Sequence, residues 1–348
     1  MAALIEQRSD ARSRMRTCVR LAWAAAMTGV MLGSGARADA QTPPAPAPGE
    51  RFALVVQGVS GDETYATRHR QWLDAMVTVL RDRFKYDAAH LIVLAEKPGA
   101  NEQRATAEAT RAVLTKLAAT LKPADQLFIM FIGHGGGEGA EAKFNLVGPD
   151  LSAVEWNALL KPVRSRIVLA DTTSASFPYL AGLAGPGRVI ITATNSFAQR
   201  FHTEFPAGFI QAFTAEAADA DKNARISLLE AFTYASRLVA QHYEQAGTMA
   251  TEKALIDDTG DGVGRDAAAT GADGTVAGLT YLDAPPMATS SNPEVQQLLQ
   301  RQQALTEQVD DLRRRKPAMP KAEFDREFER LIIELAVVSR DVRRRSGA

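Results

Sequence analysis

The chain has 348 residues, and its 40 basic and 41 acidic side chains give a formal net charge of −1. This balance provides no electrostatic basis for binding nucleic acid or an anionic membrane, so we expect neither partner. Cys18 is the only cysteine, which excludes an internal disulfide framework.

Residues 1–40 have the pattern of a secretory signal peptide. Arginines precede an apolar run at residues 21–33, and Ala38-Asp39-Ala40 fits the small-x-small cleavage rule. The run has about 13 residues, whereas a membrane-spanning helix needs about 20. We therefore expect a bacterial protein that is periplasmic or secreted, with no stable membrane span after cleavage and no Cys18. An uncleaved anchor is the alternative.

A proline-rich linker at residues 41–50 precedes a domain at residues 51–284 in which strand-like and helix-like segments alternate. Alternation of this kind is typical of an α/β domain with a mainly parallel sheet. The expected buried strands are residues 52–56, 91–94, 127–132, 166–169 and 189–193, with a short surface strand at 144–147. The expected helices are residues 65–84, 106–121, 152–160, 205–217 and 227–245, two of which begin with capping boxes.

Residues 285–348 differ in character from the domain. Apolar residues recur three and four positions apart within residues 295–312 and again within 324–342, with prolines between the two stretches. The pattern predicts two heptad-like helices that form an antiparallel helical hairpin. It leaves open whether the hairpin packs on its own domain, associates with itself or binds another partner through residues 293–342.

Two of the expected strands end in residues that carry chemistry. His134 follows the strand at 127–132 within a run of glycines, which lets the main chain approach a ligand closely. The segment Asp171-Thr172-Thr173-Ser174 follows the strand at 166–169. Ligand sites in parallel sheets form at the carboxyl ends of strands, so we expect these two loops to lie together.

The order of these motifs resembles that of a known family. The motifs are Tyr65-Ala-Thr-Arg68-His69, similar to Tyr-x-x-Arg-His; Gly133-His134-Gly135, similar to a catalytic His-Gly; residues 170–176, in the place of Ala-Cys-Glu-Ser-Gly-Ser; and residues 189–194. The family is legumain, the asparaginyl endopeptidases of the caspase–haemoglobinase fold. The resemblance covers about residues 52–264. It implies a three-layer α/β domain and a dyad of histidine and cysteine.

The cysteine of that dyad is absent. Matching Ser174-Ala175-Ser176 to the family motif places Thr172 at the nucleophile position, whereas anchoring on Asp171 places Thr173 there. A threonine hydroxyl is far harder to deprotonate than a thiol, and known threonine nucleophiles borrow a free N-terminal amine. The catalytic positions His134, Thr172 and Thr173 are therefore expected to be degenerate.

Three functions follow from these observations. The first is an inactive peptidase homologue that binds or scaffolds a peptide or protein ligand, with Arg68, Gly135 and Ser174 at the ligand. The second is an active hydrolase that uses Thr172, Thr173 or Ser174 with His134. The third is an interaction protein that acts through its helical hairpin.

Arg68 matches the family's arginine for asparagine recognition, which works with an acid in the loop after the strand at 189–193. Residues 195–200 contain no acid, so we expect Arg68 to lack this partner. His90, His202 and His242 stand singly in the sequence and are expected to be ordinary surface or core residues.

An acidic segment near residue 220 reproduces positions 1, 3, 5, 9 and 12 of an EF-hand loop. Its ligand-type residues are Asp219, Asp221, Asn223, Ser227 and Glu230, and Ala224 stands where the loop normally has glycine. Either the segment binds calcium, or its side chains only cap a turn and the following helix. We expect no other cofactor.

Overall fold

The structure is a computed structural model. It describes residues 49–137, 139–196, 202–269, 271–285, 290–316 and 319–346. The expected signal peptide at residues 1–40, and the expected linker except for its last two residues, lie outside these ranges.

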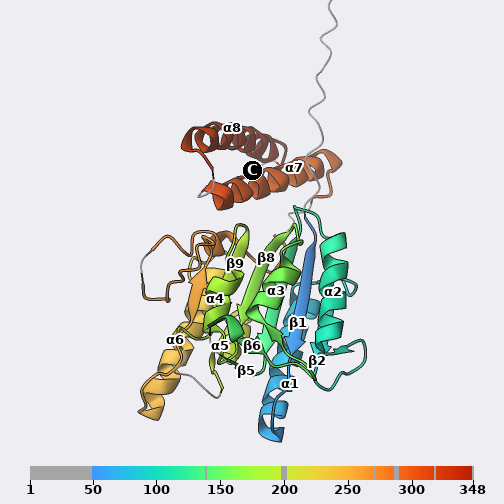
Figure 1. The fold of residues 1–348 in the computed structure, drawn as a ribbon. Coiled ribbons are helices and arrows are strands. Elements are labelled where there is room, and N and C mark those ends of the chain that lie inside the picture. The colour runs from blue at the N-terminus through green and yellow to red at the C-terminus, as the bar shows by residue number, and fades with distance from the viewer. Residues whose placement is uncertain are drawn as a thin grey trace, which may run out of the picture. The chain divides into compact units, whose positions relative to one another are not determined.

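The domain is a three-layer α/β structure built on a seven-stranded sheet (Figure 1). Six strands run parallel, and only the edge strand β10 runs antiparallel to its neighbour β9. In spatial order the strands are β10 (Leu255–Asp257), β9 (Arg188–Thr192), β8 (Arg166–Asp171), β4 (Gln126–Ile132), β1 (Arg51–Gln57), β2 (Leu91–Ala95) and β3 (Gln103–Arg104).

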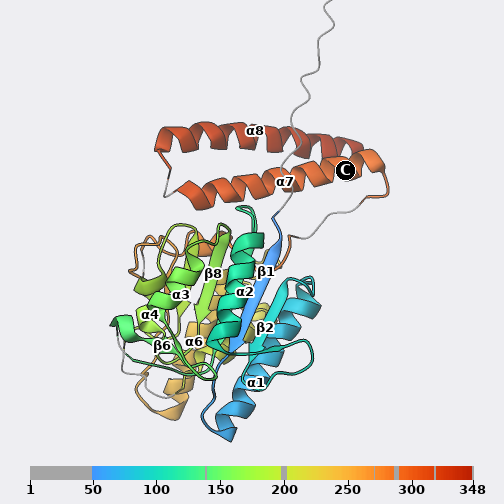
Figure 2. The same cartoon turned by 45° about the vertical axis from the view of Figure 1, so that its right-hand side comes forward.

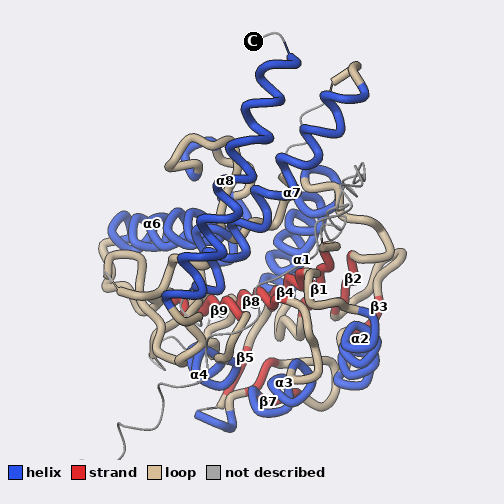
Figure 3. The backbone as a smooth tube through the Cα atoms, turned by 90° about the horizontal axis from the view of Figure 1, so that it is seen from above, coloured by secondary structure: helices blue, strands red, loops and turns tan. Residues whose placement is uncertain are grey.

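Helices cover both faces of the sheet, as the view along the strands shows (Figure 3). One face carries α1 (Glu63–Thr78), α5 (Phe205–Ala212) and α6 (Leu228–Ala246), and the other carries α2 (Ala107–Thr120), α3 (Ala153–Leu160) and α4 (Phe177–Leu183).

Strand β1 shows why both faces are covered. Ala53 and Val55 point into the core with α1, α5 and α6, while Leu54 and Val56 point into the core with α2, α3 and α4. All four side chains are 0% exposed. A continuous apolar run is therefore expected for a strand buried on both faces, which is the pattern the sequence has.

Three expected elements differ from the structure. The helix expected at 65–84 begins earlier, with Asp62 capping the N–H of Tyr65, and its last turn is the π-helical segment Val79–Arg83. The helix expected at 205–217 ends at Ala212, before a short 3₁₀ turn at Glu216–Ala218.

The surface strand expected at 144–147 is the third difference, because Phe144 is 1% exposed and stacks on Phe131 with ring centroids 4.7 Å apart. It belongs to a small antiparallel sheet made of β5 (Gly135–Gly136), β6 (Lys143–Phe144) and β7 (Leu151–Ser152).

The C-terminal region is a helical hairpin, as predicted, formed by α7 (Pro293–Arg315) and α8 (Lys321–Ser346) (Figure 2). The helices are antiparallel, because Glu294 near the start of α7 pairs with Arg345 near the end of α8. Apolar side chains fill the seam between them: Leu305, Val309, Leu312, Phe324 and Leu331.

Candidate functional site

The candidate site lies at the carboxyl edge of the central strands. Strands β8, β4 and β1 are neighbours in the sheet, so the loops that follow them meet at one edge. The loop after β4 carries His134, and the loop after β8 carries residues 172–176. The expectation that adjacent parallel strands bring these two loops together is confirmed.

His134 is held by the loop after β1. Its Nε2 lies 3.1 Å from the carbonyl oxygen of Ser60, and because a carbonyl can only accept, this contact assigns the proton to Nε2. The Ser60 hydroxyl lies 3.0 Å from Nδ1 of His69, so one serine positions both histidines.

His69 is 1% exposed, and its ring centroid lies 5.0 Å from that of His134. Burial, followed by the charges of His134 and Arg68, lowers the pKa of His69 from 6.5 to about 4. His69 is therefore neutral at neutral pH, and its ring packs α1 against His134. The ring of Tyr65 also contacts that of His134 in a T-shaped arrangement, with the two centroids 4.8 Å apart.

Gly135 lies where the loop after β4 passes close to the loop after β8. A Cβ atom at this position would lie 2.8 Å from the Ala175 Cβ, 2.8 Å from the Lys143 carbonyl oxygen and 3.2 Å from the Thr173 Oγ1. The first two distances are too short for a side chain, which explains the glycine after His134. The third places the Thr173 hydroxyl beside the His134 loop.

Thr172 is turned toward the sheet. The side chain is 1% exposed, and its hydroxyl donates to the carbonyl oxygen of Phe131 on β4 at 2.5 Å. Its own carbonyl accepts from the Thr203 hydroxyl, also at 2.5 Å. Thr172 thus serves as a link between strand β4 and the segment before α5.

Thr173 is also 1% exposed and is bound to a buried carboxyl group, that of Asp171. The Thr173 main-chain N–H donates to Asp171 Oδ1 at 3.0 Å. Burial raises the pKa of Asp171 from 3.8 to about 7. Its Oδ2 has no hydrogen-bond partner among the residues that the structure describes. Ser174, next in the chain, is 4% exposed.

Arg68 has an acidic partner, contrary to expectation. Its Nη1 lies 3.2 Å from Oε1 of Glu204, with the two side chains 38% and 22% exposed. Glu204 stands beyond the six-residue window in which an acid was sought. Phe205 and Pro206 begin α5 and place the preceding glutamate at the helix start, so the Phe-Pro pair was the signal that could have located this acid.

His202, expected to be an ordinary surface or core residue, lies beside this ion pair. Its Nδ1 lies 3.1 Å from the Tyr65 hydroxyl, and its Nε2 lies 3.3 Å from Glu204 Oε1. The chain thus brings Tyr65, Arg68, His202 and Glu204 together next to His134. No local sequence pattern predicts this cluster, because Tyr65 and His202 are 137 residues apart in the sequence and Arg68 and Glu204 are 136 residues apart.

Glu252 binds the main chain of Glu204, and no sequence motif predicts this role. It is 2% exposed, and both carboxylate oxygens accept from the Glu204 N–H, at 2.8 and 3.1 Å. Burial raises the pKa of Glu252 from 4.5 to about 7. A remote carboxylate therefore caps α5 at its N-terminus and orients Glu204.

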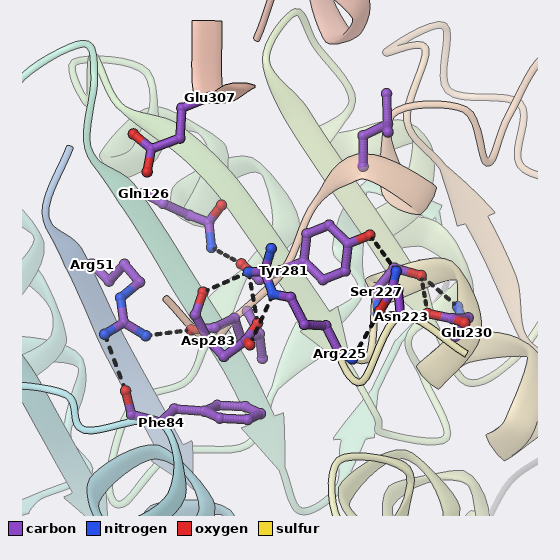
Figure 4. Close-up of polar contacts among 12 residues, drawn as sticks. Arg51, Phe84, Gln126, Asn223, Arg225, Ser227, Glu230, Tyr281, Asp283 and Glu307 are labelled. Atoms are coloured by element: carbon purple, nitrogen blue, oxygen red, sulfur yellow. Dashed lines mark hydrogen bonds and ion pairs between the residues drawn. The ribbon is translucent and has the colours of Figure 1, made fainter. Parts of the chain in front are cut away.

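The acidic segment near residue 220 forms a compact loop before α6 (Figure 4). Carboxylate oxygens of Asp219, Asp221 and Glu230 lie within 4.8 Å of one another. Ala224 adopts φ +64°, the left-handed conformation that an EF-hand loop gives to its glycine. Each oxygen of Asp219 and of Glu230 already accepts hydrogen bonds from the loop itself.

A hollow of about 280 Å³ lies at the opposite, amino edge of the sheet and includes Arg51, Arg225 and Asp283 among its lining residues. Two of its arginines are engaged: Arg51 donates to the carbonyls of Leu282 and Phe84, and Arg225 pairs with Asp283 (Figure 4). None of the expected site residues lines it.

Comparisons with known proteins leave the family open. No protein-family model matches the sequence, and no curated protein matches it. One solved structure that the chain is similar to is that of protein GSU0716 from Geobacter sulfurreducens, at 12% identity and a TM-score of 0.40, covering 60% of this chain and 92% of that one. A likeness of this size carries no functional argument. Within the described residues, no helix combines the length and apolar character needed to cross a membrane.

Proposed function

We propose that this is an exported, legumain-like peptidase homologue that binds a peptide at the carboxyl edge of its sheet without cutting it. The observation that carries the proposal is the state of the two hydroxyls at the nucleophile position. The Thr172 hydroxyl donates to the carbonyl of Phe131, and both threonine side chains are 1% exposed.

The physical argument concerns the proton that a nucleophile must lose. A threonine hydroxyl is a very weak acid. Removing the hydroxyl proton of Thr172 would also break its buried hydrogen bond to Phe131, which costs about 1–3 kcal/mol. Both residues are internal to the chain, so neither carries an N-terminal amine of its own that could take the proton. These conditions favour ligand binding over hydrolysis.

The Arg68–Glu204 pair gives the ligand its chemistry. A guanidinium offers donors and a carboxylate offers an acceptor, so the pair complements a primary amide, whose oxygen accepts and whose nitrogen donates. The resemblance to asparaginyl endopeptidases points to the same group. The ligand class that fits is a peptide with an asparagine side chain.

The experiment is a binding titration of the full chain with a fluorescent peptide containing one asparagine, followed by fluorescence anisotropy. We expect the matched leucine peptide to bind about tenfold more weakly, since hydrogen bonds to charged groups contribute about 1.5–3 kcal/mol and about 1.4 kcal/mol is a factor of ten in affinity. Arg68→Ala and Glu204→Gln should remove this preference. Arg81→Ala is the control, because Arg81 forms an exposed pair with Asp82 elsewhere on the surface. Equal affinity for the two peptides would refute the ligand assignment.

Hydrolysis by threonine is the second candidate, and one observation favours it. The Thr173 main-chain N–H donates to the carboxyl of Asp171, and the pKa of that carboxyl, about 7, lies in the range of a general base. In this case Thr173→Val would abolish peptide cleavage while Thr173→Ser retained it.

The hairpin is the third candidate, and its exposed apolar side chains favour an interaction role. Ile333 and Val337 on α8 are 57% and 43% exposed. This function is compatible with peptide binding, because it uses a different part of the chain. Its test is the mass of the full chain in solution, which self-association would raise above that of one copy.

A further inference from the structure

Helix α8 has two apolar faces, and only one of them is covered by α7. Phe324 and Leu331 face α7 and are 8% and 2% exposed. On the other side, Ile332, Ile333 and Val337 are 37%, 57% and 43% exposed. These are three of the six large hydrophobic side chains that are exposed among the described residues, so the exposure is concentrated on one helix.

The exposed residues form a continuous stripe along α8. Its members follow one another at steps of three and four, or lie side by side, which places them on one face of a helix. From start to end they are Asp325, Glu329, Ile332, Ile333, Ala336, Val337, Arg340 and Arg344, and every one is exposed. We call this set the α8 stripe.

The α8 stripe has a directional charge pattern. Its first two members are acidic, its middle four are apolar, and its last two are basic. The pattern reads acid, apolar, base in one direction and base, apolar, acid in the other. Such a face is complementary to a copy of itself that runs the opposite way.

We propose that α8 pairs antiparallel with α8 of a second copy of this chain, about a two-fold axis. The register that superposes the stripe on itself pairs Asp325 with Arg344, Glu329 with Arg340, Ile332 with Val337 and Ile333 with Ala336. Each of these pairs occurs twice across the axis, as a two-fold interface requires. The paired length is 20 residues, or about 30 Å of helix.

Parallel pairing is excluded by the same charges. It would place Glu329 against Glu329 and Arg340 against Arg340, and like charges at facing positions destabilise a helix pair. The existing contacts of the basic residues do not prevent antiparallel pairing. Arg340 and Arg344 lie 3.4 and 3.5 Å from Asp341, with side chains 65% and 67% exposed, and exposed pairs of this kind contribute little.

Neighbouring charges do not overturn this choice. Arg330 is held on the flank by Glu327 and Glu334. Arg326 and Arg343 would approach each other at the edge, where solvent and salt screen their repulsion. Asp325 already pairs with Lys321 on the same helix, but an exposed pair of this kind contributes little, so all four opposite-charge contacts can form.

The test is sedimentation velocity of the full chain between about 1 and 200 µM. Because the apolar part of the stripe is short, we expect a dissociation constant on the order of 1–100 µM. The double change Ile333→Ser with Val337→Ser should weaken the dimer by at least about tenfold. Val154→Ser, at a residue of α3 that is 59% exposed, should leave it unchanged.

The register is tested by charge exchange. Glu329→Arg alone and Arg340→Glu alone should each weaken the dimer, and the double variant should restore it, since both changes meet across the axis. Glu323→Arg, an exposed change on α8 outside the stripe, is the control. Circular dichroism should show an unchanged helix content in every variant.

Three results would overturn the proposal. The first is a chain that stays monomeric up to 200 µM, as would occur if the stripe packs on its own domain. The second is a dimer that is insensitive to the serine changes. The third is a double charge variant that is weaker than either single variant.

Discussion

Replacing Asp171 by asparagine removes an ionisable group that is fully buried at the end of β8. Burial raises the pKa of this carboxyl in the folded chain from 3.8 to about 7. The shift is roughly three units, and each unit corresponds to about 1.4 kcal/mol, so ionising Asp171 costs the fold about 4 kcal/mol. Local relaxation would reduce this figure.

The sign follows from the direction of the shift. A group whose pKa is raised on folding contributes its stability fully below the unfolded pKa, near 4, and loses it as the pH rises through the folded pKa, near 7. Between pH 4.5 and 7.5, the free energy of unfolding of the wild-type chain should therefore fall relative to that of Asp171→Asn. Glu252 is present in both proteins, so its own titration cancels in the difference.

The assay is urea denaturation of both proteins at several pH values across that window. Any penalty for an imperfectly bonded asparagine is independent of pH, so only the slope of the difference is read. Asp82→Asn is the control, because the Arg81 hydrogen bond lowers the pKa of the exposed Asp82 and its difference from wild type should be flat above pH 4.5. A flat difference for Asp171→Asn would refute the reasoning.

Three further predictions concern the site and the acidic loop. Gly135→Ala should destabilise the chain by about 1–3 kcal/mol in urea denaturation, because its Cβ would lie 2.8 Å from that of Ala175, whereas Gly136→Ala has open space and should be neutral. Thr173→Cys should gain His134-dependent cleavage of an asparagine peptide, because its sulfur would lie beside the Gly135 loop. Thr172→Cys should gain none, because this side chain faces Phe131. The reverse result would assign the nucleophile position to residue 172. Calcium at 1 mM should leave the thermal midpoint unchanged, because the loop satisfies its own carboxylates, and a rise that Glu230→Gln removes would show an ion site.

The sheet could be predicted from the sequence because its strands are buried on both faces. Runs such as residues 127–132 are apolar throughout, which is the pattern of a strand covered on both faces. The short connections between strands and helices allow only a few sheet topologies. The same reasoning correctly placed His134 and the residue 172–174 loop at one edge. The glycine after His134 was expected to let the main chain approach a ligand; the structure instead shows that a side chain there would clash with Ala175 and the Lys143 carbonyl.

The rest of the site depends on contacts between distant parts of the chain. Glu204 reaches Arg68 only because α5 packs beside α1, and Glu252 caps α5 from a segment 48 residues away. The Phe205-Pro206 pair marks Glu204 as the start of a helix, but nothing next to either glutamate in the sequence indicates which residue it contacts. The side-chain direction of Thr172 was equally hidden, because a residue at a strand end can face either the sheet or the loops.

The central claim is that the fold has kept a peptide site and lost proteolysis. The most direct measurement is mass spectrometry of a diverse peptide library incubated with the full chain and, in parallel, with His134→Ala. The account predicts that the two product profiles are the same as that of the library alone. A set of cleavages made by the wild-type chain and missing with His134→Ala would contradict it.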